Sequence, residues 1–362
     1  MIKFPFVRPT VPPPQSWQTY LQGIYERRYF TNFGPIEQEF SNALATRYAA
    51  ADAGVTLACN CTVGLTAGLI AFGVRGKVAV PAFTFPATLQ AIIGAGCEPL
   101  LCDVDPRTWE MSAGSLEHML KRRDVSALMP VRAYGFMRDF EPLLALARRY
   151  NLPVVIDAAA SLGVAPLSAD EQVMQVVSLH ATKPFGIGEG GAIFSSSSMK
   201  KRLRQILNFG LDDDKRFALG LNGKMTEIQA AIGLALMPEI ERIVARRQSM
   251  SEWYGALFSG FPDLMLPDDP GPTSWSTYPV LMPQNVDCRD FEAKASVAGL
   301  QLRRYYSPSL GEGFKDAMAP LGDTPIANDL SSRMICFPVY SDASPAELEE
   351  IGTIVRRLLR SV

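Results

Sequence analysis

The sequence predicts an α/β fold built on a mostly parallel sheet of seven strands, with helices on both faces and a smaller α+β domain at the C-terminal end. Short apolar runs rich in β-branched residues alternate with helical stretches over residues 55–208. These runs are apolar at consecutive positions, which is typical of strands buried on both faces. A stretch rich in Pro, Gly and Asp, residues 262–272, then separates them from a shorter pattern of strands and helices.

The seven strands of the sheet are expected where these apolar runs fall: Val55–Cys59, Val78–Pro81, Pro99–Val104, Ala127–Val131, Val154–Asp157, Val176–Leu179 and Ala192–Ser195. Helices are expected where apolar residues recur every three to four positions or where small residues follow a strand: 36–49, 61–71, 140–150, 199–208 and 226–254.

The C-terminal pattern predicts a strand at Tyr278–Met282, a helix at Asp290–Ala298 and a closing helix after Ser344. The start of the closing helix is well marked, because Ser344 is a good N-cap, a proline follows at the first helical position, and Glu347 completes a capping box. We expect residues 1–245 to form the larger domain and residues 246–362 the smaller one.

Composition narrows the class of protein. The chain has 362 residues, 48% apolar and 20% charged, enough for a large globular core. A net charge of −2 argues against nucleic acid or an anionic membrane as a partner. The proline-broken N-terminus is unlike a signal peptide, and no apolar run reaches the roughly 20 residues of a membrane span. We therefore expect a cytoplasmic protein.

Cysteine and histidine usage predicts no metal centre. The six cysteines are spread along the chain and read as reduced thiols rather than a disulfide framework. Cys59-Asn60-Cys61 has no histidine or second cysteine pair nearby, and His118 and His180 are the two histidines of the whole sequence. Histidine-based metal chemistry is not expected with so few ligands.

An anion site is predicted after the first strand. The carboxyl ends of parallel strands lie at one edge of a sheet, next to helix N-termini. The segment 59–64 ends the first strand and opens a helix of small residues. Free amides at such a helix start, with the hydroxyl of Thr62, suit a phosphate group. An ordinary capped helix explains the same pattern.

Two titratable residues follow other strands. Asp157 ends an apolar run, and a buried carboxylate needs a partner: a protonated pyridine nitrogen, an arginine or a helix cap. Lys183 lies between a strand end and the glycine-rich stretch 186–191. A desolvated lysine in such a place is suited to form a Schiff base, although most lysines are surface residues. Phe83 or Phe85 could stack on a planar ring or simply pack in the core.

With these residues in view, the sequence resembles the DegT/DnrJ/StrS family of sugar aminotransferases, which are fold-type I pyridoxal-phosphate enzymes. The resemblance extends from about Thr31 to the C-terminus. It rests on separate blocks in the family's order: Asn32–Pro35, Pro81–Thr88, Asp103–Pro106, Tyr134–Gly135, Ile156–Ala159, Ser178–Gly191 and Asn222–Glu227.

The resemblance implies pyridoxal 5'-phosphate as the cofactor, with pyridoxamine phosphate as an intermediate and L-glutamate as the amino donor. Lys183 would be the Schiff-base lysine that also moves a proton. Asp157 would be the partner of the pyridine nitrogen. Ala160 lies near the expected position of the cofactor's phenolic oxygen, where the family usually has glutamine or histidine.

The family pattern also implies how the rest of the cofactor is held. Phe85 occupies the ring-stacking position. Cys61 and Thr62 occupy the family's Gly-Thr phosphate turn, and Ser178 adds a hydroxyl. Asn222 resembles the asparagine that reaches the phosphate from the other subunit, which implies a homodimer with shared active sites.

Two further blocks resemble the branch of the family that aminates carbon four of dTDP-4-keto-6-deoxyhexoses. One is the Ser178–Gly191 segment together with 222–225, and the other is Arg303–Pro308. We expect Arg304 and Tyr305 to contact this nucleotide-sugar substrate. Lys224 would meet the sugar pyrophosphate or the donor carboxylate as a point charge.

Departures from the family pattern keep two other functions open. Besides Ala160, Arg132 stands where histidine is common and Cys61 where glycine is. A pyridoxal-phosphate-dependent sugar dehydratase is one alternative, but that branch carries histidine at the position of Lys183. A non-catalytic regulatory homologue that binds the cofactor is the other, and the lack of a basic patch argues against it.

Overall fold

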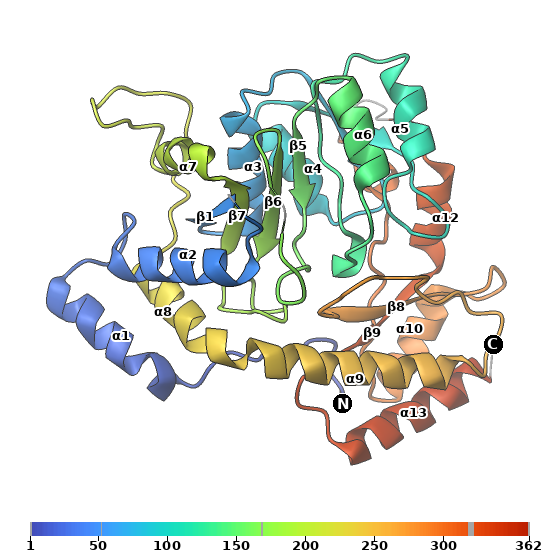
Figure 1. Ribbon diagram of the computed structural model, residues 1–362. Helices are drawn as coiled ribbons and strands as arrows, with labels where there is room; N and C mark the ends of the chain where they lie inside the picture. Colours follow the sequence, from blue (N-terminus) through green and yellow to red (C-terminus); the bar gives the residue numbers. More distant parts are fainter. Residues whose placement is uncertain (1, 52, 168, 318–321, 361–362) are drawn as a thin grey trace.

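The computed structural model describes residues 2–51, 53–167, 169–317 and 322–360, and its larger domain is built on one seven-stranded sheet (Figure 1). The strand order is β1-β7-β6-β5-β4-β2-β3. β7 pairs antiparallel with both neighbours, and all other pairs are parallel. The strands are β1 (Ala53–Ala58), β2 (Lys77–Pro81), β3 (Glu98–Cys102), β4 (Ala127–Leu128), β5 (Val154–Asp157), β6 (Val173–Ser178) and β7 (Gly191–Ser196).

The mostly parallel sheet predicted from the sequence is confirmed, although β3 ends two residues earlier than expected and β4 is much shorter. β4 was expected to reach Val131 but pairs with its neighbours only through Ala127 and Leu128. Pro130 has no amide hydrogen and cannot extend the ladder. Beyond it, Val131 forms an isolated parallel bridge with Asp157. The amide of Asp157 donates to the carbonyl of Pro130, and the amide of Arg132 donates to that of Asp157, so the chain turns away only at Ala133–Gly135.

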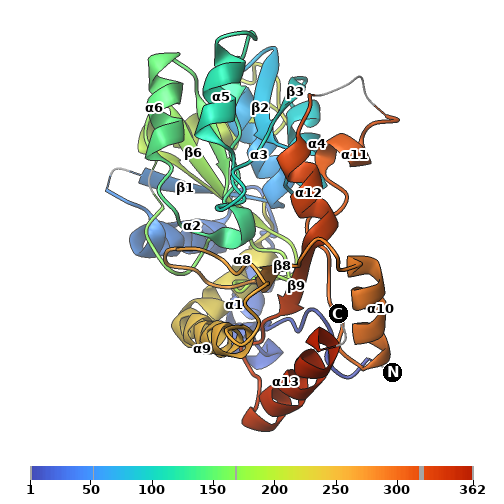
Figure 2. The ribbon, with the colours of Figure 1, turned by 90° about the vertical axis from the view of Figure 1, so that its right-hand side faces the viewer.

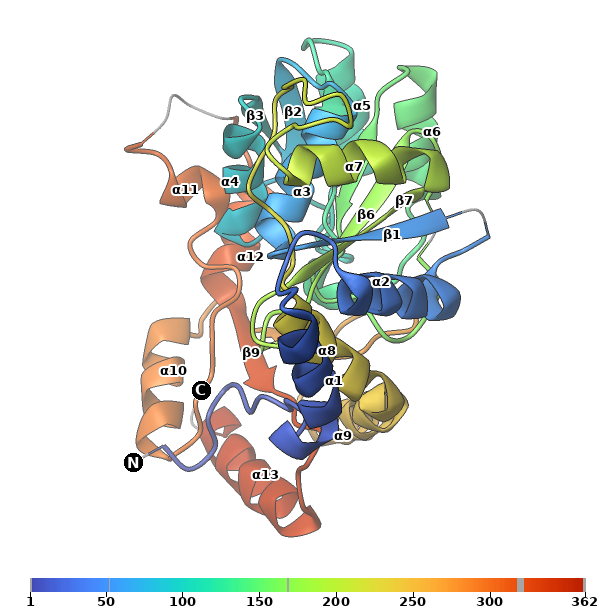
Figure 3. The same ribbon diagram turned by 90° about the vertical axis from the view of Figure 1, so that its left-hand side faces the viewer.

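Helices cover both faces of this sheet, as predicted. One apolar cluster packs the first face against α3 (Cys61–Ala71), α4 (Pro86–Gly94) and α7 (Lys200–Leu207), which lie in front of the sheet in Figure 3. A second cluster packs the opposite face, seen in Figure 2, against α5 and α6. The helices on this opposite face are α2 (Pro35–Tyr48), α5 (Ala113–Leu120), α6 (Glu141–Arg149) and α8 (Glu227–Leu236).

A smaller C-terminal unit contains the antiparallel pair β8 (Thr277–Leu281) and β9 (Met334–Pro338). Its helices are α10 (Cys288–Val297), α11 (Leu310–Gly313), α12 (Pro325–Arg333) and α13 (Pro345–Leu359). The capping box predicted at the start of α13 is present, with Ser344 and Glu347 bonding each other's backbone amides. None of the helices in the described ranges is long and apolar enough to cross a lipid bilayer.

Two further helices lie above α13 in the lower half of the molecule in Figure 1. α1 (Pro14–Arg27) packs on α8, and α9 (Ile240–Phe258) runs from the large sheet to β8 and β9. The domain boundary expected between residues 245 and 246 falls inside α9. α9 buries its first turns among the residues of the large sheet and its last turns among those of the small one, so it joins the two units.

Two carboxyl groups are buried where α2 meets α8. Glu227 accepts hydrogen bonds from the backbone amides of Ile36, at 3.1 Å, and Glu37, at 2.7 Å, and so caps α2. A Cβ atom on Gly34 would lie 2.6 Å from the carboxyl carbon of Glu227, which explains why the chain enters α2 through a glycine. Burial raises the pKa of Glu37 to about 7, although the charges of Arg204 and Lys200 oppose the rise.

The raised pKa of Glu37 makes stability depend on pH. Between the unfolded value of 4.5 and the folded value of about 7, the folded protein holds the proton more tightly than the unfolded chain. The wild type therefore loses stability as pH rises through this window. We compare the free energy of unfolding of Glu37→Gln with that of the wild type, measured by urea unfolding. The difference in favour of the variant should be about 2 kcal/mol larger at pH 8 than at pH 5. Glu39→Gln, on the exposed face of α2, is the matched control and should show no such difference.

Candidate active site

The N-terminus of α3 provides the predicted anion site. Asn60 has an extended backbone, and its side-chain oxygen accepts the amide hydrogen of Val63 at 2.9 Å. The amides of Cys61 and Thr62 belong to the first turn of the helix, where no intrahelical acceptor exists. A Cβ atom on Gly191 would lie 2.6 Å from the carbonyl of Asn60, so the start of β7 is pressed against this turn.

Asp157 ends β5 with its carboxyl group buried. One oxygen accepts the hydroxyl hydrogen of Thr88 at 2.8 Å, and the other accepts the amide hydrogen of Ala159 at 3.1 Å. Burial raises the pKa of Asp157, whereas these two hydrogen bonds and the charge of Lys183 lower it. The hydrogen bonds and the nearby cation all favour the ionised form that burial opposes.

Lys183 lies in the loop between β6 and β7, which is folded back on itself by backbone hydrogen bonds. The amide of Lys183 donates to the carbonyl of His180 at 2.8 Å, and that of Ala181 donates to Gly188 at 2.8 Å. Burial lowers the pKa of the Lys183 amine, against the charge of Asp157, which raises it. The side chain keeps part of its surface open to a pocket, so the amine is both poorly solvated and accessible.

A pocket of about 460 Å³ brings most of the predicted site residues together. Among its lining residues are eight that the sequence singled out: Cys61, Thr62, Phe85, Asp157, Ala160, Ser178, Lys183 and Tyr305. Phe85 is 53% exposed although it is a large apolar residue, because its ring forms part of the pocket wall.

Three predicted residues lie outside this pocket. Arg304 pairs with Glu292 at 3.2 Å and lines an adjoining hollow of about 450 Å³. That hollow shares the Phe85 and Tyr305 side chains with the pocket. Lys224 donates to the side-chain oxygen of Asn222 at 2.8 Å, and neither of these two residues lines the pocket of its own chain.

The pocket also contains residues to which the sequence had assigned no role. Tyr134 donates its hydroxyl hydrogen to the carbonyl of Tyr305 at 2.5 Å and stacks on Tyr306, and all three line the pocket. Gly135 has a positive φ, and a Cβ atom there would lie 2.3 Å from the carbonyl oxygen of Ala160. The Tyr134–Gly135 block was visible in the sequence, but its packing against residue 160 was not.

The other pocket residues missed by the sequence reasoning come from remote segments. Phe6 and Val7 come from the N-terminus, and Ser276 and Thr277 from the start of β8. No local pattern marks these positions. Thr88, which donates a hydrogen bond to Asp157, belongs to the Pro81–Thr88 block, but the sequence had assigned it no role.

The three departures from the family pattern have different structural outcomes. Burial raises the pKa of the Cys61 thiol well above its usual value, so the group stays neutral. The Arg132 guanidinium donates to Gln175 and to the carbonyl of Arg138, so part of its bonding capacity is used for structure. Ala160 places only a methyl group at the pocket wall.

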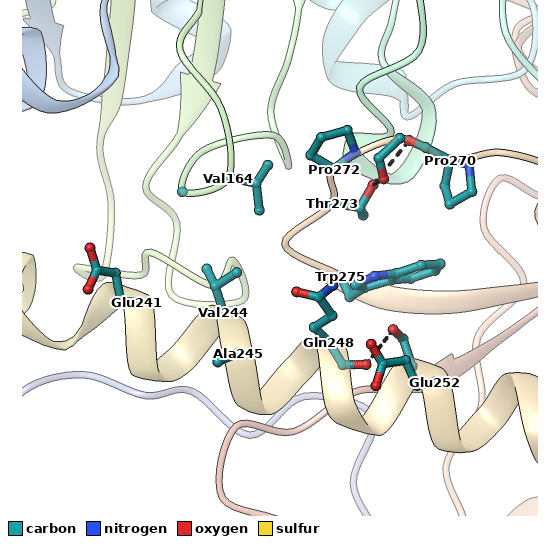
Figure 4. A pocket seen from close by; sticks show the side chains of 13 residues that line it. Val164, Glu241, Val244, Ala245, Gln248, Glu252, Pro270, Pro272, Thr273 and Trp275 are labelled. Carbon is teal, nitrogen blue, oxygen red and sulfur yellow. Dashed lines mark hydrogen bonds between the residues drawn. The ribbon is translucent and has the colours of Figure 1, made fainter.

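A second hollow, of about 650 Å³, lies between α9 and the loops at 163–164 and 270–275 (Figure 4). It is lined by the polar side chains of Glu241, Gln248 and Glu252 and by Trp275. No lysine or arginine is among its described lining residues. The pocket around Lys183 is smaller, but it combines an amine, a carboxylate and a helix N-terminus, so we assign the chemistry there.

Comparison with known proteins identifies the family to which this chain belongs. Residues 15–356 match the model of the DegT/DnrJ/EryC1/StrS aminotransferase family. The dTDP-4-amino-4,6-dideoxy-D-glucose transaminase of Shigella dysenteriae is 28% identical, covering 97% of this chain and 98% of that protein. The GDP-perosamine synthase of Caulobacter vibrioides is 32% identical over 65% of each chain.

A solved structure from Bacillus cereus ATCC 10987, assigned as a PLP-dependent aminotransferase, superimposes with a TM-score of 0.89 at 28% identity. It covers 98% of this chain, and this chain covers 99% of it. The fold is therefore that of pyridoxal-phosphate-dependent aminotransferases. Since the family match spans nearly the whole sequence, the chain belongs to the DegT/DnrJ/EryC1/StrS aminotransferase family.

The contact between Gly191 and the α3 turn predicts a sensitive position. We expect Gly191→Ala to lower the stability by about 1–3 kcal/mol, because its Cβ atom meets backbone that cannot move aside. Gly260→Ala is the matched control, since a Cβ atom there meets nothing within 4 Å. Thermal unfolding of both variants checks the prediction, which fails if their melting temperatures fall equally.

Proposed function

We propose that this protein moves an amino group from L-glutamate to a nucleotide-linked 4-keto-6-deoxyhexose, using pyridoxal 5'-phosphate held on Lys183. The observation that carries the proposal is the meeting of three groups in one pocket: the amine of Lys183, the carboxylate of Asp157 and the N-terminus of α3. These three groups suit a cofactor with an aldehyde, a ring nitrogen and a phosphate.

The residues of the pocket fit this cofactor. Asp157 would pair with the protonated ring nitrogen, and the exposed ring of Phe85 would stack on the cofactor ring. The first amides of α3, with Thr62 and Ser178, would hold the phosphate. The close packing of Gly191 on this turn keeps side-chain atoms out of the cradle. When bound, the cofactor supplies an electron sink for the bond that is broken at the amino donor.

Lys183 and Asp157 divide the remaining chemistry. Because burial lowers the pKa of Lys183, its amine is more readily neutral and can take the proton from the α-carbon of the donor. Burial raises the pKa of Asp157, but the hydrogen bonds from Thr88 and the amide of Ala159 favour its ionised form, which would hold a positive charge on the ring nitrogen. The reverse sequence of proton transfers at the sugar carbon completes the transfer of the amine.

Two observations support a nucleotide-sugar acceptor. The similar proteins from Shigella and Caulobacter are named for amino-sugar nucleotides. In this chain the pocket and the hollow lined by Arg304 adjoin each other and share Phe85 and Tyr305 as lining residues. That hollow gives the substrate room beyond the sugar, and Arg303 and Arg304 offer positive charge to a pyrophosphate.

A homodimer with shared active sites accounts for the residues that lie outside the pocket. Asn222 and Lys224 follow a hairpin, closed by bridges at 208–222 and 211–217, that projects beyond α7 in Figure 1. Three large apolar side chains on this hairpin are more than half exposed: Phe209, Phe217 and Leu219. Such an apolar surface is typical of an interface. We propose that Asn222 reaches the cofactor phosphate in the partner subunit.

Replacing the catalytic lysine tests the central assignment. We expect Lys183→Ala to abolish amine transfer from L-glutamate and to remove the visible absorption of the lysine-bound cofactor, because no other pocket amine among the described residues can replace it. Lys201→Ala, which removes an exposed lysine paired with Asp213, should leave both unchanged. Full turnover in Lys183→Ala, or a wild type that ignores glutamate, would contradict the proposal.

Mixing subunits tests the shared site. In a homodimer with shared sites, each site takes Lys183 from one subunit and Asn222 from the other. In a mixed dimer of Lys183→Ala and Asn222→Ala, both defects therefore fall in one site and the other site is intact. Unfolding and refolding the two variants together should therefore restore about a quarter of the wild-type activity. If each chain completes its own site, the mixture will show only the average of the two parents.

A further inference from the structure

Residues 3–10 are fastened to the small domain. Residues 3–10, here called the N-terminal strap, begin with a parallel bridge between Phe4 and Leu300. The amide of Phe4 donates to Gly299 at 2.8 Å, and that of Gln301 donates to Phe4 at 2.9 Å. The strap is therefore held, through one isolated bridge, beside the segment that leads to Arg304 and Tyr305.

Side chains anchor the strap at both ends. Lys3 pairs with Glu350 at 2.6 Å. Arg8 pairs with Glu347 at 2.9 Å and with Asp342 at 3.1 Å, and its guanidinium lies over the ring of Tyr340. Because these contacts bracket the middle of the strap, Phe6 and Val7 are held in one position.

The middle of the strap enters the active-site pocket. Phe6 donates its amide to the side chain of Gln301 at 2.9 Å, and both Phe6 and Val7 line the pocket that contains Lys183. The ring of Phe6 meets Tyr305 edge to face at 5.6 Å, and Phe85 meets Tyr305 at 6.3 Å. All four of these side chains line the pocket, and Tyr305 is the one among them that carries a hydrogen-bonding group.

The ionised and hydrogen-bonding groups of the catalytic centre come from other elements. Asp157, Ser178, His180 and Lys183 belong to the large sheet and its loops. Neither Phe6 nor Val7 has a side-chain hydrogen-bonding group. A substrate hydroxyl placed against them loses its water without gaining a side-chain partner, whereas a deoxy carbon buries apolar surface there.

We propose that Phe6 and Val7 determine acceptor specificity by contacting a deoxy carbon of the sugar, so that the enzyme favours a deoxy sugar over its hydroxylated counterpart. This inference rests on the function proposed above and deepens it. The strap acts on the half-reaction that transfers the amine to the sugar. It does not act on the half-reaction with the amino donor, because the donor is small and docks on the polar groups around Lys183.

The first experiment compares two acceptors with the wild-type holoenzyme: a dTDP-linked 4-keto-6-deoxyhexose and the same 4-keto sugar with a hydroxyl at carbon six. An apolar pocket discriminates against an added hydroxyl by up to about 100-fold. We expect kcat/KM to favour the deoxy acceptor by about 10- to 100-fold. Equal values for the two acceptors would overturn the inference.

Substitutions in the strap then test whether Phe6 and Val7 cause the preference for the deoxy acceptor. Phe6→Ala should lower kcat/KM for the deoxy acceptor by about tenfold or more, through the loss of buried apolar contact. Val7→Thr keeps the shape of the side chain but offers a hydroxyl as a hydrogen-bond partner for the substrate hydroxyl. It should therefore reduce the ratio of kcat/KM between the deoxy and the hydroxylated acceptor. Val11→Thr is the matched control, because Val11 is 44% exposed and outside the pocket, and should leave the ratio unchanged.

The half-reaction with L-glutamate distinguishes a failure of the proposed function from a failure of the inference about the strap. It is followed by the change in cofactor absorption when L-glutamate alone is added, and we expect Phe6→Ala and Val7→Thr to change its rate less than they change kcat/KM for the sugar acceptors. If the wild type itself shows no such change, the proposed function fails. If the strap variants convert glutamate normally but keep the wild-type acceptor ratio, only the inference about the strap fails. A parallel loss in both half-reactions would assign the strap a structural role and also overturn the inference.

Discussion

The buried carboxylate of Asp157 is the constraint on which the rest of the site depends. A charge at the end of an apolar strand is costly unless every nearby group favours it. Here Thr88 comes from the helix after β2, the amide of Ala159 from the turn after β5, and the cation of Lys183 from the loop after β6. Holding one carboxylate therefore requires three strand ends to lie together, which only the parallel order of the sheet provides.

Close backbone contacts keep these strand ends in register. Gly191 touches the turn that opens α3, and Gly135 touches the carbonyl of Ala160 at distances that exclude any side chain. Glu227 performs a similar task further away by capping α2 with its buried carboxylate. Each contact joins residues remote in sequence, so the pocket is rigid around the amine of Lys183 while its outer wall is built from the small domain.

The sequence predicted the sheet and the central residues well because their patterns are local. All seven strands were found, and α3 begins and ends where the small residues predicted. The helices α1, α4, α5, α11 and α12 and the strand β9 were not predicted. α4 has only 9 residues and is apolar around much of its surface, so it lacks a clear periodicity. α1 starts without a side-chain cap and buries only Ile24, so its sequence carries little helical pattern.

Lys183, Asp157 and the α3 turn could be picked out from the sequence because each directly follows a strand, and parallel strands bring their ends to one edge. The tertiary structure alone decided that Phe6, Val7, Ser276 and Thr277 line the same pocket. Their places depend on pairing with segments hundreds of residues away, as in the bridge from Phe4 to Leu300. Local sequence sets the preference of each segment for helix or strand and the chemistry of its side chains. Such long-range contacts depend instead on how the whole core packs.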